Sequence, residues 1–550
     1  MNLIQDCIQN LRLAVVVVVA VILGNMTGMS QTDKDLPHLE KRGKATQLIV
    51  DGNPFLMLAG ELGNSSASDA MYMRHIWPLL AKMHLNTVLI PAYWELIEPT
   101  EGNFDFRLID SVLSGAREQN LRVVFLWFGT WKNSMSCYVP SWVKTNEQRF
   151  PRARTANDKA EEILTPFSPE NLQADIRAFS AFMRHLHAVD ASNRTVLLVQ
   201  VENEIGMIPD ARDHCALAEK AYAGQVPSEL MSYLRKNRES LNPETKEMWQ
   251  NAGMKSGGTW EEVFGSGIGT EEVFMAWYFG RYTNAVAEAG KHEYPLPMYV
   301  NAALIRPNYK PGQYPSGGPL PHLFDIWRAA TPSIDLFAPD IYFQNFSEWC
   351  SRYVRQGNPL FIPEARNTQS IANAFYAMGQ LNAMGYSPFS IENVPDPGTN
   401  QVSTGYAVLQ QLTPMIIEGQ EKGTLGGVLL DSVKQTADIS LGDYTFAFRH
   451  EYSWPYARRT GVDTPRVGGL IIMLAHDEFI IAGTGLVVTF APRSAMNSTA
   501  GIASIDEGSF ENGKWIPGRR LNGDEDHQGR HLYLPGSTFG IQKVKLYTYR

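Results

Sequence analysis

Short apolar, β-branched runs recur along the chain between about residues 47 and 392, and each run ends in a polar or aromatic residue. A stretch with the periodicity of an amphipathic helix follows most of these runs. This alternation is typical of parallel βα units. Eight runs are interpreted as strands, at residues 55–61, 87–92, 123–128, 195–204, 298–302, 336–342, 360–364 and 387–392.

The hydrophobic pattern of these runs favours a closed barrel of the α/β class. Runs such as VVFLWF and LLVQV are apolar almost without interruption, as strands buried on both faces are. Between them, residues 108–118, 171–187, 271–289 and 371–383 are each apolar along one stripe, which predicts helices. We therefore expect a (β/α)₈ TIM barrel. An open doubly wound sheet is the alternative, but no glycine-rich phosphate loop follows the first run.

Two connections stand out. Asp51-Gly52 lies between two apolar runs and predicts a tight hairpin before the first barrel strand, at the closed end of the barrel. The connection at residues 206–296 is far longer than a barrel loop needs, and such loops rarely lack secondary structure. We expect it to contain helices and to form one wall of the active-site mouth.

The hydrophobic pattern of the chain changes from alternating strands and helices to short strands after a predicted helix at residues 406–418. Strand-like runs separated by Gly, Pro and Asp-rich turns predict a β-sandwich-like second domain at 423–550, after a catalytic barrel at 31–422. The run at 470–490 is apolar enough to raise the alternative of a membrane span. Charged positions at 476–478 interrupt it, so two buried strands are expected instead.

The N-terminus resembles an export signal. Arg12 precedes an apolar run at 13–23, and small or polar residues follow it. We expect residues 1–30 to be a signal peptide, with the protein in the periplasm or outside the cell, or alternatively an uncleaved membrane anchor. Cys7 would leave with a cleaved signal, and the remaining three cysteines do not indicate a disulfide framework.

Composition and charge indicate which kinds of molecule the protein binds. The formal net charge is −9, so the chain lacks the basic surface that nucleic-acid binding requires. The chain is rich in aromatic residues, at 11%, which suits a protein that stacks flat neutral ligands such as carbohydrates. No membrane contact is expected beyond the N-terminal segment, and nothing in the sequence fixes an oligomeric state.

Acidic residues end several of the predicted barrel strands, where the chemistry of this architecture takes place. A single acid at such a position is more often a helix N-cap or an ion-pair partner. Four strand ends that carry Glu toward one mouth are harder to explain in that way. They are the ends of the first, fourth, seventh and eighth strands: Glu61, Glu202 or Glu204, Glu364 and Glu392.

Two carboxyl groups on opposite sides of a barrel mouth match the requirements of glycosidic cleavage, which needs one protonated acid and one ionised carboxylate. Tyr342 ends the sixth strand, next to the seventh, so its hydroxyl is expected to donate to Glu364. Strand alternation places Glu202 and Glu204 on one face and Asn203 on the other, so periodicity alone does not choose between the two acids.

Three strings, VDGNPFLMLAGE, LIPAYWELIEPTEGNFDF and VQVENEIG, resemble the β-galactosidases of glycoside hydrolase family 35 over most of residues 47–392. In that family the acid/base follows an Asn at the end of the fourth strand. The resemblance thus implies that Glu204, after Asn203, is the acid/base, and that Glu364 in PLFIPEARN is the nucleophile. The C-terminal part resembles a domain found in a bacterial branch of the family.

The sequence also departs from that family. Leu62 and Gly63 follow Glu61 where a His-Tyr pair is usual, and Pro91 stands at a sugar-binding Tyr position. The third strand ends in FGTWKNS where an Ala-Glu-Trp segment is usual. The catalytic pair is therefore better supported than galactose specificity. The expected substrate-binding residues are Glu61, Trp131, Asn133, Asn203 and Tyr342, with Trp131 as a sugar-stacking platform or, equally, a packing residue.

Other chemistries find no support in the motifs. The sequence has no HExxH motif, no Cys cluster and no G-x-S-x-G elbow, so we expect neither a metal, nor a cofactor, nor a serine nucleophile. The leading hypothesis is a retaining, exo-acting β-galactosidase that acts on plant cell-wall galactosides, such as xyloglucan fragments. The alternatives are a clan relative that cleaves another β-glycoside or an α-L-arabinopyranoside, and a carbohydrate-binding barrel without activity.

Overall fold

The structure, a computed structural model, describes residues 36–366, 371–453, 464–493, 498–521 and 530–550. The expected export segment at residues 1–30 lies outside the described residues.

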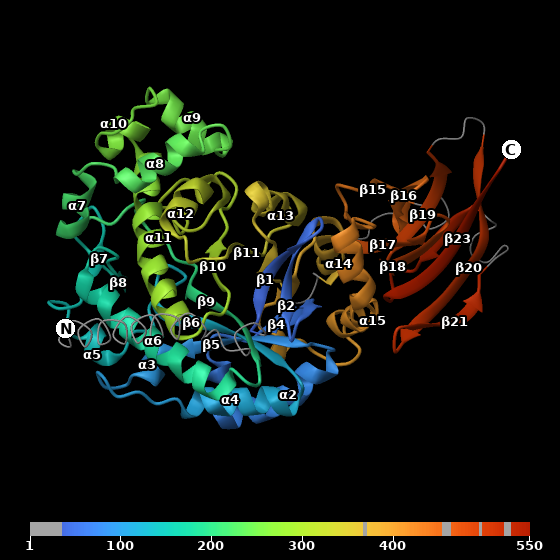
Figure 1. Cartoon of the computed structure of the whole chain (residues 1–550), viewed down its shortest axis with the longest axis horizontal. Helices are drawn as coiled ribbons and strands as arrows, with labels where there is room; N and C mark the ends of the chain where they lie inside the picture. Colours follow the sequence, from blue (N-terminus) through green and yellow to red (C-terminus); the bar gives the residue numbers. More distant parts are fainter. Residues whose placement is uncertain (1–35, 367–370, 454–463, 494–497, 522–529) are drawn as a thin grey trace, which may run out of the picture.

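Eight parallel strands close into a barrel, which confirms the predicted fold class (Figure 1). Their order around the ring follows the chain, and β9 pairs with β10 to complete the circle. The strands are β4 (Met57–Glu61), β5 (Thr87–Tyr93), β6 (Arg122–Lys132), β9 (Val196–Asn203), β10 (Met298–Ala303), β11 (Leu336–Ile341), β12 (Phe361–Ala365) and β13 (Gly385–Pro388). Almost all their residues are buried, because helices cover the outside and side chains fill the interior.

The eighth strand differs from the expectation. It ends at Pro388, and Ser390 adopts a left-handed conformation with φ of 55°, which ends the extended run. Glu392 consequently lies in a short 3₁₀ helix, η5 (Ile391–Asn393), and not at a strand end. Its carboxylate accepts hydrogen bonds from the Gly63 amide at 2.9 Å and from the Ser66 hydroxyl. This acid therefore anchors the loop after β4.

The main covering helices between the strands are α2 (Ala70–Lys82), α4 (Arg107–Glu118), α6 (Pro169–Asp190), α11 (Ile268–Glu293), α12 (Phe324–Ala330), α13 (Phe346–Tyr353) and α14 (Ile371–Leu381). Four of these seven, α4, α6, α11 and α14, correspond to helices predicted from their apolar stripes. The long connection after β9 contains helices, as expected. Besides α11 these are α7 (Ala216–Tyr222), α8 (Ser228–Lys236), α9 (Pro243–Asn251) and α10 (Trp260–Phe264).

The predicted hairpin before the barrel is present. It joins β2 (Ala45–Val50) to β3 (Asn53–Phe55) in a three-stranded sheet with β1 (His38–Arg42). Asp51 and Gly52 have φ of 52° and 73°, as a tight hairpin of the I′ type requires. Asp51 also forms ion pairs with Arg122 at the start of β6 and Arg194 just before β9, so the hairpin lies at the N-terminal end of the barrel.

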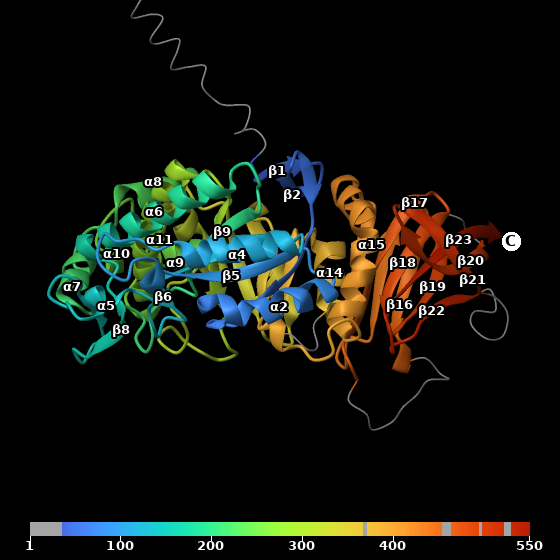
Figure 2. The ribbon, with the colours of Figure 1, turned by 90° about the horizontal axis from the view of Figure 1, so that it is seen from below.

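The C-terminal part is a two-layer β domain beside the barrel (Figure 2). One sheet has the strand order β14-β17-β18-β23-β20-β21, and the other β15-β16-β19-β22. The six-stranded sheet packs against α14 on the face turned away from its partner sheet, near α15 (Gln401–Lys422), so its central strands are buried on both sides. The strands of this sheet are β14 (Leu425–Leu430), β17 (Val467–Ala475), β18 (Glu478–Thr484), β23 (Gly540–Tyr549), β20 (Thr499–Glu511) and β21 (Lys514–Arg520). Those of the smaller sheet are β15 (Thr436–Leu441), β16 (Tyr444–His450), β19 (Leu486–Pro492) and β22 (His531–Leu534).

The apolar run at residues 470–490 forms β17, β18 and the start of β19. Its strands belong to the β domain, in agreement with the expectation of buried strands. Among the described residues, none of the helices has the length and apolarity that crossing a membrane would need.

Candidate active site

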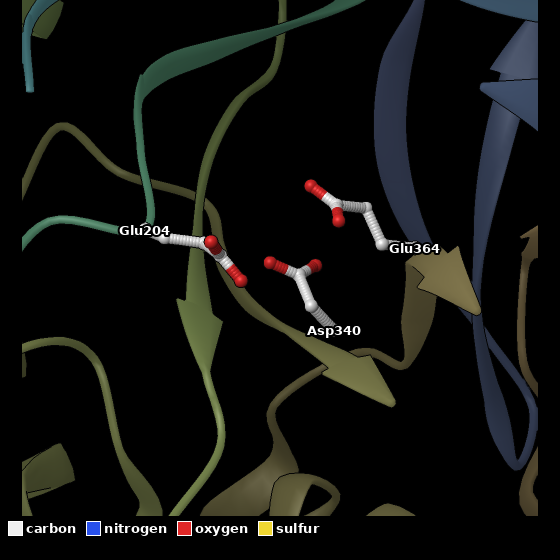
Figure 3. A group of neighbouring side chains, drawn as sticks. All are labelled: Glu204, Asp340 and Glu364. Atoms are coloured by element: carbon white, nitrogen blue, oxygen red, sulfur yellow. The ribbon is translucent and has the colours of Figure 1, made fainter. Parts of the chain in front are cut away.

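The carboxyl ends of the barrel strands bring a group of polar side chains together. The candidate acid/base and nucleophile come from β9 and β12, and a third acid comes from β11. Figure 3 shows the carboxyl groups of Glu204, Asp340 and Glu364 pointing toward a common space. One oxygen of each lies within 4.8 Å of the others.

Glu204 directly follows β9, and its side chain is 6% exposed. Its carboxylate accepts a hydrogen bond from the Asn133 amide, and its backbone N–H donates to Asn301 Oδ1 at 2.9 Å. The hydroxyl of Ser134 donates to its backbone carbonyl at 2.8 Å. Three separate contacts thus fix both the backbone and the carboxyl group of this residue.

The structure resolves the ambiguity between the two acids of this strand. Glu202 and Glu204 both have positive φ, 62° and 45°, so the alternation of an extended strand does not apply to them. Glu202 is fully buried, and its Oε2 accepts from the Trp131 backbone amide at 2.8 Å. Burial, followed by the negative charge of Asp175 on α6, outside the ring, raises its pKa well above the usual value. Glu204 alone faces Glu364.

Glu364 lies near the end of β12 and is 4% exposed. The Tyr342 hydroxyl donates to its Oε2 at 2.7 Å, as predicted, and the Asn203 amide donates to its Oε1 at 3.4 Å. These two donors hold the carboxylate in one orientation.

Asn203 and Asn133 each donate a hydrogen bond to one of the two candidate acids. The Lys132 ammonium donates to Asn203 Oδ1 at 2.8 Å, which orients the Asn203 amide toward Glu364. Asn133 donates to Glu204. Sequence reasoning named Lys132 only as a departure from the family pattern. In the structure its positively charged ammonium group lies within this group of acids.

Asp340 is a site residue that sequence reasoning missed. It pairs in register with Glu364 on the neighbouring strand and is 2% exposed. The Asn301 amide donates to its Oδ2 at 2.7 Å. The sequence could have indicated this residue, because residues two apart on a strand share a face and Asp340 stands two positions before the predicted site residue Tyr342.

Glu61 ends β4 and is fully buried. Neither of its carboxyl oxygens has a hydrogen-bond partner among the described residues. Burial, followed by the negative charge of Glu364, raises its pKa well above the usual value. The acid therefore adds a further carboxyl group, without a protein partner among the described residues, to the same group.

Trp131 does not join the group. Its ring is fully buried and packs edge-on against Phe279 and Tyr282 of α11, with centroid distances of 5.5 and 4.7 Å. The ring has no exposed face on which a sugar can stack. This position corrects the stacking role expected for Trp131, because the strand end turns the indole outward into the helix layer.

The electrostatics separate the two catalytic candidates. Burial, followed by the negative charge of Glu364, raises the pKa of Glu204 to about 7. A carboxylic acid that remains partly protonated at neutral pH can act as a general acid. Glu364, held by two donors, is arranged to act as a carboxylate.

The described residues also offer a possible cation position. Glu204, Asp340 and Glu364 each present one oxygen, the ligand atom that hard cations prefer. Three such ligands fall short of the six to eight that Ca²⁺ takes.

Two parts of the chain are similar to known protein families. Residues 68–264 match the family model for β-galactosidases of glycoside hydrolase family 42, and residues 402–533 match a domain of unknown function (DUF5597). The first match includes Glu204 and ends before Glu364. This part of the chain is therefore similar to the β-galactosidase domain of that family. The model is that of family 42, so the narrower resemblance to family 35 is not supported by it.

Individual relatives are distant. The chain is 25% identical over 183 residues to a β-galactosidase of Xanthomonas manihotis, a match that covers 32% of this chain and 28% of the relative. Among solved structures, the cold-adapted β-galactosidase of Rahnella sp. R3 is similar over 65% of this chain and 56% of its own, with 14% identity and a TM-score of 0.42. The β-galactosidase of Bacillus circulans sp. alkalophilus is similar over 66% and 57%, with 12% identity and a TM-score of 0.45.

Proposed function

We propose that this protein is a glycoside hydrolase, an exo-acting β-galactosidase that retains the anomeric configuration. The observation that carries the proposal is the close approach of the Glu204 and Glu364 carboxyl oxygens, within 4.8 Å. Retaining enzymes keep their two carboxyl groups about 5 to 5.5 Å apart, whereas inverting enzymes leave room for a water at about 6.5 to 9.5 Å. The short distance supports a nucleophilic role for the second acid.

In the first step, the Glu364 carboxylate attacks the anomeric carbon while Glu204 donates its proton to the leaving oxygen. The Tyr342 hydroxyl and the Asn203 amide aim the attacking carboxylate. In the second step, the Glu204 carboxylate takes a proton from water, which attacks the glycosyl ester and releases the sugar. Glu204 is protonated again and Glu364 is free.

Two further residues are proposed to bind the sugar. Glu61 has both oxygens unpartnered in the described part of the chain, so it can accept hydrogen bonds from two sugar hydroxyls. Asn203 lies beside the nucleophile, where it can also reach a hydroxyl next to the reacting carbon. A site with buried acceptors of this kind selects neutral, hydroxyl-rich ligands.

The natural substrate is proposed to be a plant cell-wall oligosaccharide or polysaccharide with terminal β-D-galactose, such as galactosylated xyloglucan. This choice rests on the sequence resemblance to family 35 in the strings around Trp94 and Glu204, and the family 42 match does not bear on it. We further propose that residues 1–30 direct export from the cytoplasm. Sequencing the N-terminus of the protein isolated from periplasmic and extracellular fractions tests that assignment.

A panel of nitrophenyl glycosides tests the activity. The β-D-galactoside is expected to have the highest kcat/KM, above the β-D-glucoside and the α-L-arabinopyranoside. Equal or higher rates on either of the others would favour the clan-relative alternative. Binding of galactosides without cleavage of any would favour the non-catalytic barrel.

Substitution of the nucleophile tests the mechanism. Glu364→Gln is expected to abolish turnover, while Glu288→Gln, at an exposed position on α11, is expected to keep it. NMR of the first-formed sugar should show the β anomer, because two displacements restore the configuration. Full activity of Glu364→Gln, or an α anomer as first product, would contradict the proposal.

A further inference from the structure

Asp340 adds a third carboxyl group to the space between the proposed acid/base and nucleophile. Its backbone is in register with Glu364, and an oxygen of each of the three acids lies within 4.8 Å of the others. Hydrolysis with retention needs only two carboxyl groups. The third acid therefore needs a role of its own.

The donors around Asp340 are few and fixed. Asn301 Oδ1 accepts the Glu204 backbone N–H at 2.9 Å, so its amide nitrogen must be the end that faces Asp340 Oδ2, at 2.7 Å. The other Asp340 oxygen, Oδ1, has no donor from the described residues. Asn301 thus links Asp340 to the backbone of Glu204. Asp340 Oδ1 is left without a donor among the described residues, in a group of three carboxyl groups.

The neighbouring acids are better supplied with donors. Glu364 receives hydrogen bonds from both Tyr342 and Asn203. Glu204 receives one from Asn133 and lies within the influence of the Lys132 charge. Three buried carboxylates this close would repel one another without compensation, so the arrangement requires a proton among them.

Asp340 is the best place for that proton. One of its oxygens lies within 4.8 Å of an oxygen of Glu204, and its Oδ1 has no hydrogen-bond partner among the described residues, so an O–H on Asp340 has the Glu204 carboxyl group as a near acceptor. Burial, followed by the charges of Glu364, Glu204 and Glu61, raises the pKa of Asp340 well above its usual value. The titratable groups that face the cluster from the surrounding strands and from α13 are Glu61, Lys132, Glu204, Tyr299, Tyr342, Tyr353 and Glu364.

We propose that Asp340 is a positioning residue that remains a neutral carboxylic acid and donates its O–H to the carboxyl group of Glu204. The inference rests on the proposed function. When Glu204 passes its proton to the leaving oxygen, the bond from that oxygen to the anomeric carbon breaks and Glu204 becomes a carboxylate. The Asp340 O–H stabilises this charge and keeps its own proton. Water later returns the proton to Glu204.

Two substitutions test the neutral state. Asn at position 340 can still accept from Asn301 and donate an N–H to Glu204, so Asp340→Asn should keep kcat/KM within the same order of magnitude. Leu offers neither contact, so Asp340→Leu should lower kcat/KM roughly 10- to 100-fold, as expected for a lost hydrogen bond to a charged group. Asp158→Asn, at a highly exposed position, controls for the loss of one negative charge.

The direction in which the alkaline limb of the pH profile moves shows whether Asp340 is neutral or ionised. A lost donor disfavours the Glu204 carboxylate, so Asp340→Leu should move the alkaline limb of kcat/KM to higher pH, with the limb of Asp340→Asn unchanged. If Asp340 were ionised, both substitutions would remove a repelling charge and move the limb to lower pH. A limb at lower pH in both variants would overturn the proposal. If Asp340→Leu does not fold, a limb at lower pH in Asp340→Asn is sufficient to overturn it.

An infrared measurement separates this inference from the proposed function. A protonated carboxyl group has a C=O stretch distinct from that of a carboxylate, and ¹³C-aspartate labelling shifts the bands that come from Asp. Near neutral pH the unaltered protein should show a labelled band of a buried protonated Asp that is missing in Asp340→Asn. Its absence from the unaltered protein would overturn the inference whether or not any galactoside is cleaved.

Discussion

Tyr342 donates its hydroxyl hydrogen to Glu364 Oε2 across 2.7 Å. The two residues come from neighbouring strands, with Tyr342 one position beyond the end of β11. Since the Asn203 amide contacts the other oxygen, the carboxylate is held from both sides and points toward Glu204. This contact orients the proposed nucleophile.

Removal of the Tyr342 hydroxyl should therefore slow the chemical step more than it weakens binding. Tyr342→Phe keeps the ring and is expected to lower kcat roughly 10- to 100-fold, the cost of one hydrogen bond to a charged group, with a smaller change in KM. Steady-state kinetics on the nitrophenyl galactoside measure both constants. Tyr309→Phe, on an exposed loop, is the control. An unchanged kcat in Tyr342→Phe would show that the contact has no catalytic role.

Activity should fall as the pH rises through about 7. Burial and the charge of Glu364 raise the pKa of Glu204 to about 7, and the proton donor works only in its protonated form. Below this pH Glu204 is protonated and ready to donate, and above it the proton is lost. The dependence of kcat/KM on pH measures the limb in the free enzyme. A profile that stays flat to clearly alkaline pH would contradict the assignment.

Lys132 should set the position of that limb. Its positive charge lowers the pKa of Glu204, so Lys132→Met is expected to raise this pKa and move the limb to higher pH. Loss of its hydrogen bond to Asn203 should also reduce kcat. Lys310→Met, at an exposed position, should change neither. A shift of the limb to lower pH in Lys132→Met would contradict the electrostatic account.

The hairpin at the N-terminal end of the barrel allows a stability prediction. Gly52 has φ of 73° with open space around its Cα, so Gly52→Ala is penalised only by the left-handed backbone. We expect the free energy of unfolding to fall by about 1 to 2 kcal/mol. Gly257 also has open space but no positive φ, so Gly257→Ala should be close to neutral. Denaturant unfolding of both variants measures the difference, and equal effects would contradict the interpretation.

The barrel could be predicted from the sequence because its strands are buried on both faces. That burial produces near-continuous apolar runs, and helices separate them with a different period. The eighth strand was placed too late, since β13 is only the four residues GYSP and gives little pattern. Glu392 looked like a strand end for the same reason. Its contacts with Gly63 and Ser66 depend on the tertiary fold.

The sequence allowed the two candidate catalytic acids and Tyr342 to be predicted. It did not allow the backbone conformation at the strand ends or the directions of the side chains to be predicted. The positive φ values at Glu202 and Glu204 break the strand alternation, and no local pattern announces them. Asp340 was overlooked because its role depends on its register with Glu364 across two strands. The direction of Trp131, into the helix layer, likewise depends on packing against α11.

Trapping the covalent intermediate tests the central claim most directly. A 2-deoxy-2-fluoro-β-galactosyl fluoride slows both displacements but has a good leaving group, so the glycosyl ester accumulates on the nucleophile. Peptide mapping by mass spectrometry should find one fluorosugar per chain, attached to Glu364, and no label in Glu364→Gln. A label on Glu204, Asp340 or Glu61, or turnover of natural substrate with no trapped ester, would contradict the account.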